Sequence, residues 1–199
     1  MFEVAEYIGL IAFAISGFFV AVRSRLDFLG VLISVFLTAF GGGIIRDVIV
    51  DRTPYAFSND IPAMIIIMVM MILIILKYHK RDSIENRPFF ILSDSIGLVS
   101  FSVTGALIAM ETSLNITGVL ALAFITAVGG GITRDVIINE VPFVFKTGFY
   151  GTVSLLVGLC LYLLEKVGML NPYMITAVFT AGVALRMIAY YRRWSIPLY

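Results

Sequence analysis

The chain has 199 residues, of which 60% are hydrophobic and 14% are charged, and its mean hydropathy is +1.03. Ordinary soluble domains carry about 25% charged residues, so the composition excludes that class and predicts an all-α integral membrane protein. The formal net charge of +1 shows no excess of basic residues that would favour nucleic acid, and we expect no nucleic-acid partner.

Seven stretches approach the length of about 20 mostly apolar residues that a bilayer span requires. In chain order they are Val4–Val22, Phe28–Val50, Ile61–Leu76, Phe89–Met110, Ile116–Ile138, Thr147–Leu164 and Pro172–Tyr191. The N-terminus carries Glu3 and Glu6 where a secretory signal would carry basic residues. The first stretch is therefore predicted to remain as a helix of the mature protein.

A gapless internal repeat, with an offset of 88 positions, organises these stretches. The segment GGGIIRDVI at 41–49 returns as GGGITRDVI at 129–137, and only the fifth residue differs. Further matched pairs are Glu6 with Asp94, Ser16 with Thr104, Asp27 with Asn115, Gly30 with Gly118, and Thr38 with Thr126. The sequence therefore predicts a three-helix repeat with its connector over 1–88 and a second repeat over 89–170. Residues 171–199 form a seventh helix and the C-terminal tail.

A repeat unit with an odd number of spans enters the membrane from the opposite side in its second copy, so the two repeats are predicted to be inverted. Lysine and arginine concentrate in the loops of one face, which is therefore predicted to be cytoplasmic. That face holds Arg23, Arg25, Lys77, Lys80, Arg81, Arg87, Lys146, Arg192 and Arg193, and the other holds Arg52 and Lys166. The N-terminus is then outside and the C-terminus inside.

Each copy of the repeated segment begins with three glycines, and each glycine weakens a helix by about 1 kcal/mol relative to alanine. We expect the second and fifth helices to bend or unwind there and to expose carbonyl oxygens, at Gly41, Gly42 and Gly43 and at Gly129, Gly130 and Gly131. The hydroxyls of Thr38, Thr126, Ser16 and Thr104 would add oxygen ligands that suit a cation. Close packing of helices is the alternative role of these small residues.

An arginine and an aspartate follow each glycine triplet, as Arg46-Asp47 and Arg134-Asp135. Adjacent side chains point about 100° apart on a helix, so we expect Arg46 to reach Asp135 or the backbone of the second repeat, and Arg134 to make the reciprocal contact with Asp47. These charges either line a pore or lock the bundle. The only histidine, His79, lies in the polar connector, so we expect no metal site, no cofactor and no enzymatic activity.

Two inverted three-helix repeats with a doubled Gly-Gly-Gly-x-x-Arg-Asp motif, followed by a seventh helix, resemble the trimeric intracellular cation (TRIC) channel family. The resemblance spans the whole chain and is strongest to the prokaryotic branch, which overlaps a bacterial family described as glycine-transporter-like. It implies a homotrimer in the lipid bilayer, with an hourglass-shaped, potassium-permeable pore in each subunit and helices two and five kinked at the glycines. Potassium or sodium would be the permeant ion.

The chain departs from the animal members of that family, which carry Lys-Glu-Val after one glycine triplet, whereas this chain carries Arg-Asp-Val after both. Lipid recognition and calcium-linked regulation are therefore not carried over, and the resemblance implies the plasma (inner) membrane of a prokaryote. The sequence thus predicts a passive monovalent cation channel lined by helices one, two, four and five. The alternative is a secondary carrier of a small amino acid such as glycine, in which Arg46 and Arg134 hold the carboxylate. Asp47 and Asp135 would then hold an ammonium group or a coupling ion.

Overall fold

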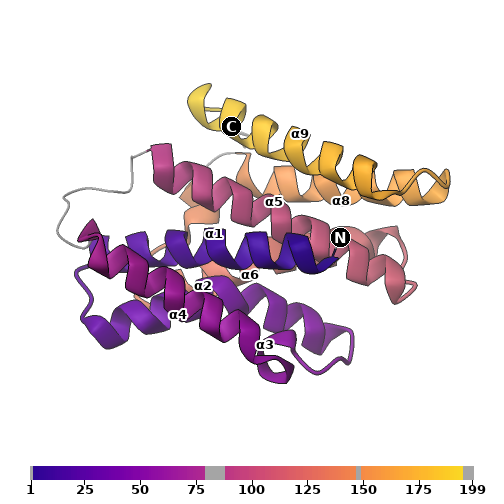
Figure 1. The fold of residues 1–199 in the computed structure, drawn as a ribbon. Coiled ribbons are helices and arrows are strands. Elements are labelled where there is room, and N and C mark those ends of the chain that lie inside the picture. The colour runs from indigo at the N-terminus through magenta and orange to yellow at the C-terminus, as the bar shows by residue number, and fades with distance from the viewer. Residues whose placement is uncertain (1, 79–87, 147–148, 195–199) are drawn as a thin grey trace.

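The computed structural model describes residues 2–78, 88–146 and 149–194, and it places these segments in a bundle of helices (Figure 1). In chain order the helices are α1 (Phe2–Arg23), α2 (Phe28–Ile49), α3 (Tyr55–Ser58), α4 (Asp60–Ile75), α5 (Pro88–Glu111), α6 (Ile116–Ile137), α7 (Phe143–Lys146), α8 (Tyr150–Lys166) and α9 (Pro172–Tyr191). All seven predicted stretches form helices. The predicted start of the sixth stretch, Thr147, lies outside the described residues.

Five of the described helices, α1, α2, α5, α6 and α9, are long and apolar enough to cross a membrane. Helix α4 has 16 residues and α8 has 17. At 1.5 Å per residue they are roughly 24–26 Å long, somewhat less than the roughly 30 Å hydrocarbon core. The protein is therefore an all-helical membrane protein with five clear spans. The short helices α3 and α7 were not predicted, because four residues are too few to show a hydrophobic period.

Matched caps set the starts of α2 and α6 at equivalent positions of the two repeats. The carboxylate of Asp27 accepts a hydrogen bond from the amide of Gly30 at 2.8 Å, and the side-chain oxygen of Asn115 accepts one from Gly118 at 2.9 Å. Each contact satisfies an amide that has no partner within the first turn of its helix. The repeat pairs Asp27 with Asn115 and Gly30 with Gly118 because these residues form the same cap twice.

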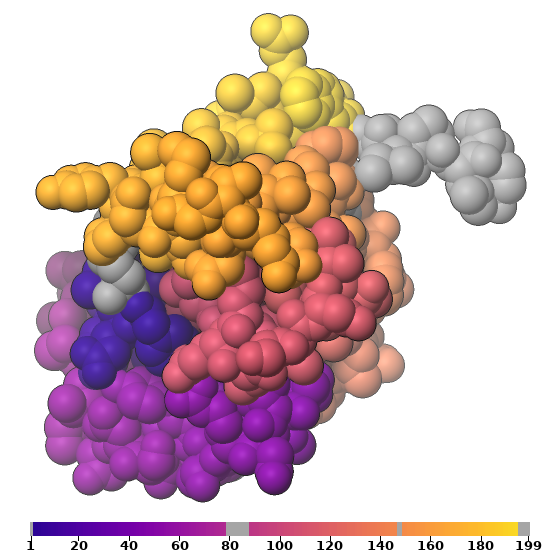
Figure 2. All heavy atoms as spheres, turned by 90° about the vertical axis from the view of Figure 1, so that its right-hand side faces the viewer, coloured from indigo at the N-terminus to yellow at the C-terminus, as the bar shows by residue number. Residues whose placement is uncertain are grey.

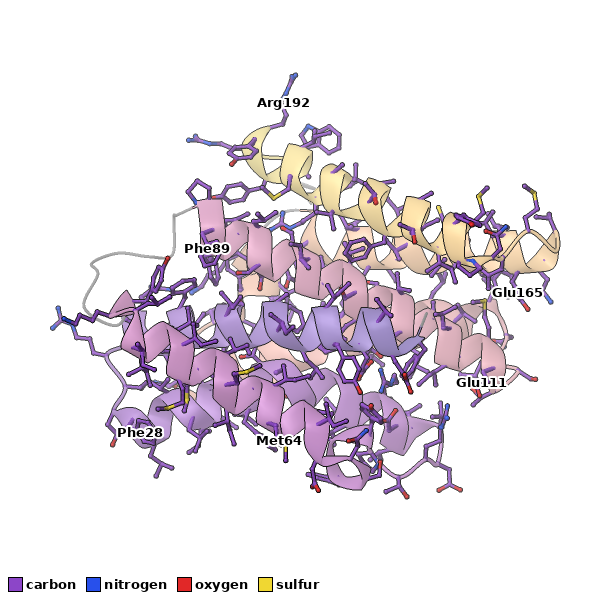
Figure 3. The ribbon with its side chains drawn as sticks, in the orientation of Figure 1. Phe28, Met64, Phe89, Glu111, Glu165 and Arg192 are labelled. Carbon is purple, nitrogen blue, oxygen red and sulfur yellow. The ribbon has the colours of Figure 1, made fainter. Side chains whose placement is uncertain are left out.

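The first helices of the two repeats run in opposite directions. Figure 1 shows the N-terminus, where α1 begins, at the end of the bundle where Figure 3 shows Glu111, the last residue of α5. Phe89, near the start of α5, lies at the opposite end (Figure 3). This antiparallel arrangement is the one that an inverted repeat requires.

Helices α1 and α5 contact each other through two equivalent glycine–phenylalanine pairs. Gly9 faces the ring of Phe101, and Gly97 faces the ring of Phe13. The two phenylalanine rings also pack edge to face, with their centroids 5.2 Å apart. Residues 97 and 101 are 88 positions beyond residues 9 and 13, so each repeat supplies one glycine and one ring to the contact.

Several hydroxyl side chains are buried within the apolar core of the bundle, and large apolar side chains cover much of its exterior. The buried face of α5 carries hydroxyls from Ser93, Ser95, Ser100, Ser102 and Thr104. Along α4, by contrast, exposed side chains are apolar, as at Met64, which is 65% exposed and points away from the bundle in Figure 3. An apolar exterior around a hydroxyl-rich interior suits a protein that holds a polar path within lipid.

Basic residues gather at the end of the bundle that lies opposite the start of α1. On one end face, the N-terminal end of α1 lies between the α8–α9 connection and the α3–α4 segment (Figure 2). At the opposite end, basic residues end α1 and α7 and follow α4 and α9, namely Arg23, Lys146, Lys77 and Arg192. The other predicted basic residues of the connector, Lys80, Arg81 and Arg87, lie outside the described residues, as does His79.

Candidate functional site

The two glycine triplets bring α2 and α6 into backbone contact. A Cβ atom added at Gly42 would collide with the carbonyl oxygen of Thr126, and one added at Gly130 would collide with the carbonyl oxygen of Thr38. A Cβ at Gly41 would lie 2.9 Å from the Cα atom of Gly130. We refer to this contact, made by Gly41, Gly42, Gly129 and Gly130, as the glycine crossing.

Of the two predicted outcomes at the glycines, bending or unwinding, unwinding does not occur, since α2 and α6 are helical without interruption through both triplets. The close packing between the two helices holds the backbone in helical geometry. A kink without unwinding stays a prediction. The third glycine of each triplet has more room, because a Cβ at Gly43 would lie 3.5 Å from Glu6 Oε1 and one at Gly131 would lie 3.8 Å from Arg134 Nη2.

A buried cluster around Arg46, which we call the first cluster, lies beyond the glycine crossing on one side. Arg46 is fully buried and donates hydrogen bonds to Glu6 Oε2 and Asp47 Oδ1, each at 2.8 Å, and to Thr104 Oγ1 at 3.2 Å. Burying a guanidinium is costly unless carboxylates surround it, and here two do. The cluster joins α1, α2 and α5.

The prediction that Arg46 pairs with Asp135 and Arg134 with Asp47 is wrong. Each arginine instead binds the aspartate next to it in the sequence, at 2.8 Å for Arg46 and 2.7 Å for Arg134. The long arginine side chain folds along its own helix, so its guanidinium reaches a carboxylate whose Cβ points elsewhere. The contacts that cross between the repeats are made to hydroxyls, from Arg46 to Thr104 and from Arg134 to Thr38.

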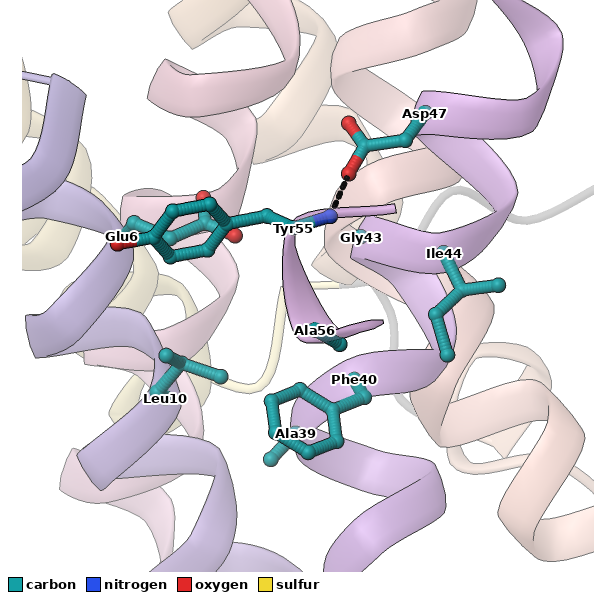
Figure 4. A pocket seen from close by; sticks show the side chains of 9 residues that line it. All are labelled: Glu6, Leu10, Ala39, Phe40, Gly43, Ile44, Asp47, Tyr55 and Ala56. Carbon is teal, nitrogen blue, oxygen red and sulfur yellow. Dashed lines mark hydrogen bonds between the residues drawn. The ribbon is translucent and has the colours of Figure 1, made fainter. Parts of the chain in front are cut away.

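The second carboxylate oxygen of each motif aspartate starts a short helix. Asp47 Oδ2 accepts a hydrogen bond from the amide of Tyr55 at 2.9 Å, drawn in Figure 4, and Asp135 Oδ2 accepts one from the amide of Phe143 at 2.8 Å. Tyr55 begins α3 and Phe143 begins α7, so the aspartates satisfy unpaired first-turn amides. Each motif thus positions a short helix beside its arginine.

The second cluster, around Arg134, differs from the first in its contacts to other helices. Arg134 Nε donates to Asp135 Oδ1 at 2.8 Å and Arg134 Nη1 donates to Thr38 Oγ1 at 3.4 Å. Asp94, the repeat partner of Glu6, instead accepts a hydrogen bond from Ser16 Oγ at 3.0 Å. The aspartate side chain is one methylene shorter than the glutamate side chain, and no direct ion pair from Asp94 to Arg134 is formed within the described residues.

The predicted hydroxyl residues are all buried, and three of them join the clusters. Thr104 contacts Arg46, Ser16 contacts Asp94, and Thr38 contacts Arg134. Thr126 donates to the carbonyl of Leu122 in its own helix at 2.6 Å, as Thr38 does to that of Ser34, but unlike Thr38 it accepts no hydrogen bond from an arginine among the described residues. It therefore contributes its backbone oxygen to the glycine crossing and not its hydroxyl to a cluster.

Two equivalent hollows lie against the two clusters, on opposite sides of the glycine crossing. The first hollow is shown in Figure 4, and its lining includes Glu6, Gly43, Ile44, Asp47 and Tyr55. The second hollow is lined at the repeat-related positions by Asp94, Gly131, Ile132, Asp135 and Phe143, with Thr38 and Tyr150 in addition. Both hollows contain carboxylate oxygens inside a protein whose exterior is apolar.

Two polar features were missed by the sequence reasoning. The Tyr55 hydroxyl hydrogen-bonds with the Tyr7 hydroxyl at 2.8 Å and accepts a bond from Asn59 at 2.9 Å. Burial, with the bond to Tyr7, raises the pKa of Tyr55 to about 12, so its hydroxyl stays protonated at neutral pH. Arg186 of α9 is 1% exposed, and a lone arginine in an apolar stretch was the available signal.

Comparison with known proteins shows the family. A family model described as "Glycine transporter" matches residues 3–78 and again residues 91–166. The chain belongs to this family. Residue 91 is 88 positions beyond residue 3, so the two matched segments start at the offset of the internal repeat.

Bacterial relatives of this family match the chain almost from end to end. The UPF0126 membrane protein YvgT of Bacillus subtilis (strain 168) is 34% identical over 196 residues, covering 98% of this chain and 95% of its own. The UPF0126 inner membrane protein YadS of Escherichia coli (strain K12) is 31% identical over 196 residues, covering 97% of this chain and 92% of its own.

Solved structures of TRIC channels share both the fold and the sequence. One, from a study of conductance through TRIC cation channels, has a TM-score of 0.86 and 31% identity and covers 100% of this chain and 97% of its own. A prokaryotic TRIC channel crystallised in 0.5 M KCl has a TM-score of 0.88 and 28% identity, with 98% of both chains covered. The predicted membership of the TRIC family is confirmed.

Proposed function

We propose that the protein is a passive, potassium-permeable channel for monovalent cations, with a pathway inside each subunit. The observation that carries the proposal is the pair of equivalent, carboxylate-lined hollows on opposite sides of the glycine crossing. The pathway runs from the first hollow, past the crossing of α2 and α6, to the second hollow. The likeness to TRIC cation channels supports this reading.

The charge of the first hollow favours cations. Glu6 and Asp47 share one arginine in the first cluster, which leaves a net charge of −1 when all three groups are ionised. A buried negative charge at the mouth of a narrow path raises the local concentration of cations. Hydroxyl and carbonyl oxygens then replace part of the hydration shell of the ion. The arginines hold the carboxylates in place and neutralise part of their charge.

The membrane arrangement belongs to the same proposal. Helices α4 and α8 complete seven spans, because basic anchors after α4 and at the end of α8 lengthen their reach into the headgroup region. The end of the bundle that carries Arg23, Lys77, Lys146 and Arg192 faces the cytoplasm. The N-terminus is then outside, in the plasma membrane of a prokaryote, and the chain assembles as a homotrimer like the channels it resembles.

Single-channel recording of the purified protein in a planar bilayer with asymmetric KCl tests this function. We expect discrete openings that reverse near the potassium equilibrium potential. Silent bilayers, together with saturable glycine uptake into proteoliposomes, would instead establish the carrier. The alternative has the family description in its favour.

Cysteine accessibility tests the route. In a Cys160→Ser background, a charged thiol reagent should block Gly43→Cys from one side of the membrane and Gly131→Cys from the other, because these glycines border different hollows. Ile33→Cys on the apolar exterior of α2 is the matched control and should not be blocked. Equal block of both variants from one side would contradict a pathway that passes the glycine crossing.

A further inference from the structure

Helix α9 contributes a buried guanidinium that the repeated motif does not explain. Arg186 is 1% exposed, and its guanidinium carbon lies 4.9 Å from the centre of the Tyr150 ring and 5.9 Å from that of Tyr190. Within the described residues, its Nε and Nη2 atoms have no hydrogen-bond partner. An arginine buried without a contacting carboxylate is costly, and in membrane proteins such residues mark functional sites.

Arg186 stands behind the wall of the second hollow. The ring that it contacts, Tyr150, lines that hollow together with Asp94. Asp94 lies within electrostatic reach of Arg134, which also lines this hollow, and of Arg186 behind it. Asp94 accepts hydrogen bonds from Ser16 Oγ, at 3.0 Å, and from the Tyr150 hydroxyl, so its carboxyl group is held by neutral hydroxyls and not by a contact ion pair.

The first hollow lacks this arrangement. There the equivalent carboxylate, Glu6, is bound directly by Arg46 at 2.8 Å. Helix α9 follows the second repeat and has no counterpart in the first. The positive charge of Arg186 is therefore added beside the second hollow alone. The two ends of the proposed pathway therefore differ in how their carboxylate is neutralised, by contact in one and at a distance in the other.

We propose that Asp94 holds a permeant monovalent cation in the second hollow and that Arg186, placed behind Tyr150, is the positioning residue that limits how strongly the cation is held. The inference rests on the proposed function and deepens it. A cation in the second hollow meets a carboxylate free of a contacting arginine, together with the hydroxyl of Thr38. The positive charge of Arg186 opposes that binding through space, and the channel consequently conducts unequally in its two directions.

Current–voltage curves of single channels in symmetric KCl test the inference. Arg186→Gln should change the ratio of currents at equal and opposite voltages by about threefold or more, as expected for removing a unit charge near a partly buried ion site. Arg186→Lys keeps the charge and should keep the ratio. Arg192→Gln removes a basic residue from the exposed end of the same helix and is the matched control.

Changes at Asp94 complete the test. Asp94→Asn should move the ratio in the direction opposite to Arg186→Gln, and the double variant should return toward the wild-type value. Asp94→Glu lengthens the side chain so that it reaches Arg134 as Glu6 reaches Arg46, and should bring the ratio toward one. This variant keeps the test decisive if Arg186→Gln does not assemble.

The outcomes separate the two proposals. Wild-type protein that passes no cation current overturns the proposed function. Wild-type protein that conducts, with a ratio unaffected by Arg186→Gln or by Asp94→Glu, overturns only the inference. A lower melting temperature of Arg186→Gln with an unchanged current ratio would show that Arg186 has a structural role. That result would also overturn the inference.

Discussion

The two clusters grow from nearly identical nine-residue segments, yet they satisfy their arginines differently. In the first, Glu6 reaches across from α1 and binds Arg46 at 2.8 Å. In the second, Asp94 of α5 accepts a hydrogen bond from Ser16, and Arg134 donates to Thr38. A duplicated motif therefore fixes the contacts made within its own segment, whereas contacts to other helices depend on residues that diverged after duplication.

The local unit of each motif is the part that stays the same. Arginine Nε donates to the adjacent aspartate at 2.8 Å in both copies, and the other aspartate oxygen caps a short helix at 2.9 Å in one and 2.8 Å in the other. Backbone amides supply these caps, so side-chain divergence in α3 and α7 leaves them intact. The difference between the clusters lies in the contacts to other helices, where glutamate in one repeat is replaced by the shorter aspartate in the other and the arginines bond different hydroxyls.

The largest effect that tests the equivalence of the two repeats is expected at the glycine crossing. Gly42→Ala and Gly130→Ala each place a Cβ against a backbone carbonyl, which cannot rotate away, so each should destabilise the protein by about 3 kcal/mol. Thermal unfolding in detergent, followed by size-exclusion chromatography, measures the loss. The two variants should lose similar amounts because their contacts are equivalent.

The third glycine of each triplet gives the matched control. Gly43→Ala and Gly131→Ala meet nothing closer than 3.5 Å and add a better helix former, so their melting temperatures should match or exceed that of the wild type. Equal destabilisation at all four positions would mean that flexibility of the glycines matters and not the close approach of the helices.

A smaller effect should distinguish the two carboxylates. Glu6→Gln removes a charge-assisted bond to fully buried Arg46 and should cost about 2 kcal/mol. Asp94→Asn replaces a carboxylate that accepts from a hydroxyl and should cost about 1 kcal/mol. The difference in melting temperature between the two variants measures the difference between these two stability costs. If Asp94→Asn proves the more harmful, the second carboxylate has a structural role that its contacts do not reveal.

Much of the fold follows from the sequence because hydropathy and repeat offset are global signals. All seven apolar stretches became helices, and the pairing of Gly9 with Phe101 and of Gly97 with Phe13 is what inversion of the repeat requires. The arginine partners could not be derived in the same way. Helical geometry places Cβ atoms, whereas a long arginine side chain adds several ångströms of reach in any of several rotamers.

The remaining misses have local causes. Helices α3 and α7 start where an aspartate eight residues earlier caps an amide, and their own four residues show no pattern that predicts a helix. Arg186 was visible as a charge in an apolar stretch, but its role depends on Tyr150, which approaches it only in the folded bundle. Unwinding at the glycines was expected from their propensity, and tertiary packing overrides that propensity here.

The smallest expected effect concerns two exposed ion pairs at opposite ends of the bundle. Arg23 pairs with Glu140 at 3.5 Å, and Arg52 pairs with Glu111 at 3.3 Å. Residues 111 and 140 are 88 positions beyond 23 and 52, so inversion makes the same contact twice with the charges exchanged. Both pairs join the end of the first helix in one repeat to the segment after the second helix in the other.

The pair at the end near the second cluster should matter more. Glu140 also accepts from Ser24 at 3.3 Å, lies 3.9 Å from Lys146, and has a side chain 30% exposed against 68% for Glu111. Exposed ion pairs contribute little, so we expect Glu140→Gln to cost about 1 kcal/mol and Glu111→Gln about 0.3 kcal/mol. Thermal unfolding at low and high salt measures both costs, and high salt should remove most of each.

Exchanging the charges provides the control for this last prediction. The double variant Arg23→Glu with Glu140→Arg reproduces at one end the order of charges found in Glu111 and Arg52 at the other. It should recover more of the stability than either single reversal, because the repeat already accommodates that order once. Failure to recover, or equal costs for Glu140→Gln and Glu111→Gln, would show that packing holds the two ends together and that the ion pairs contribute little to stability.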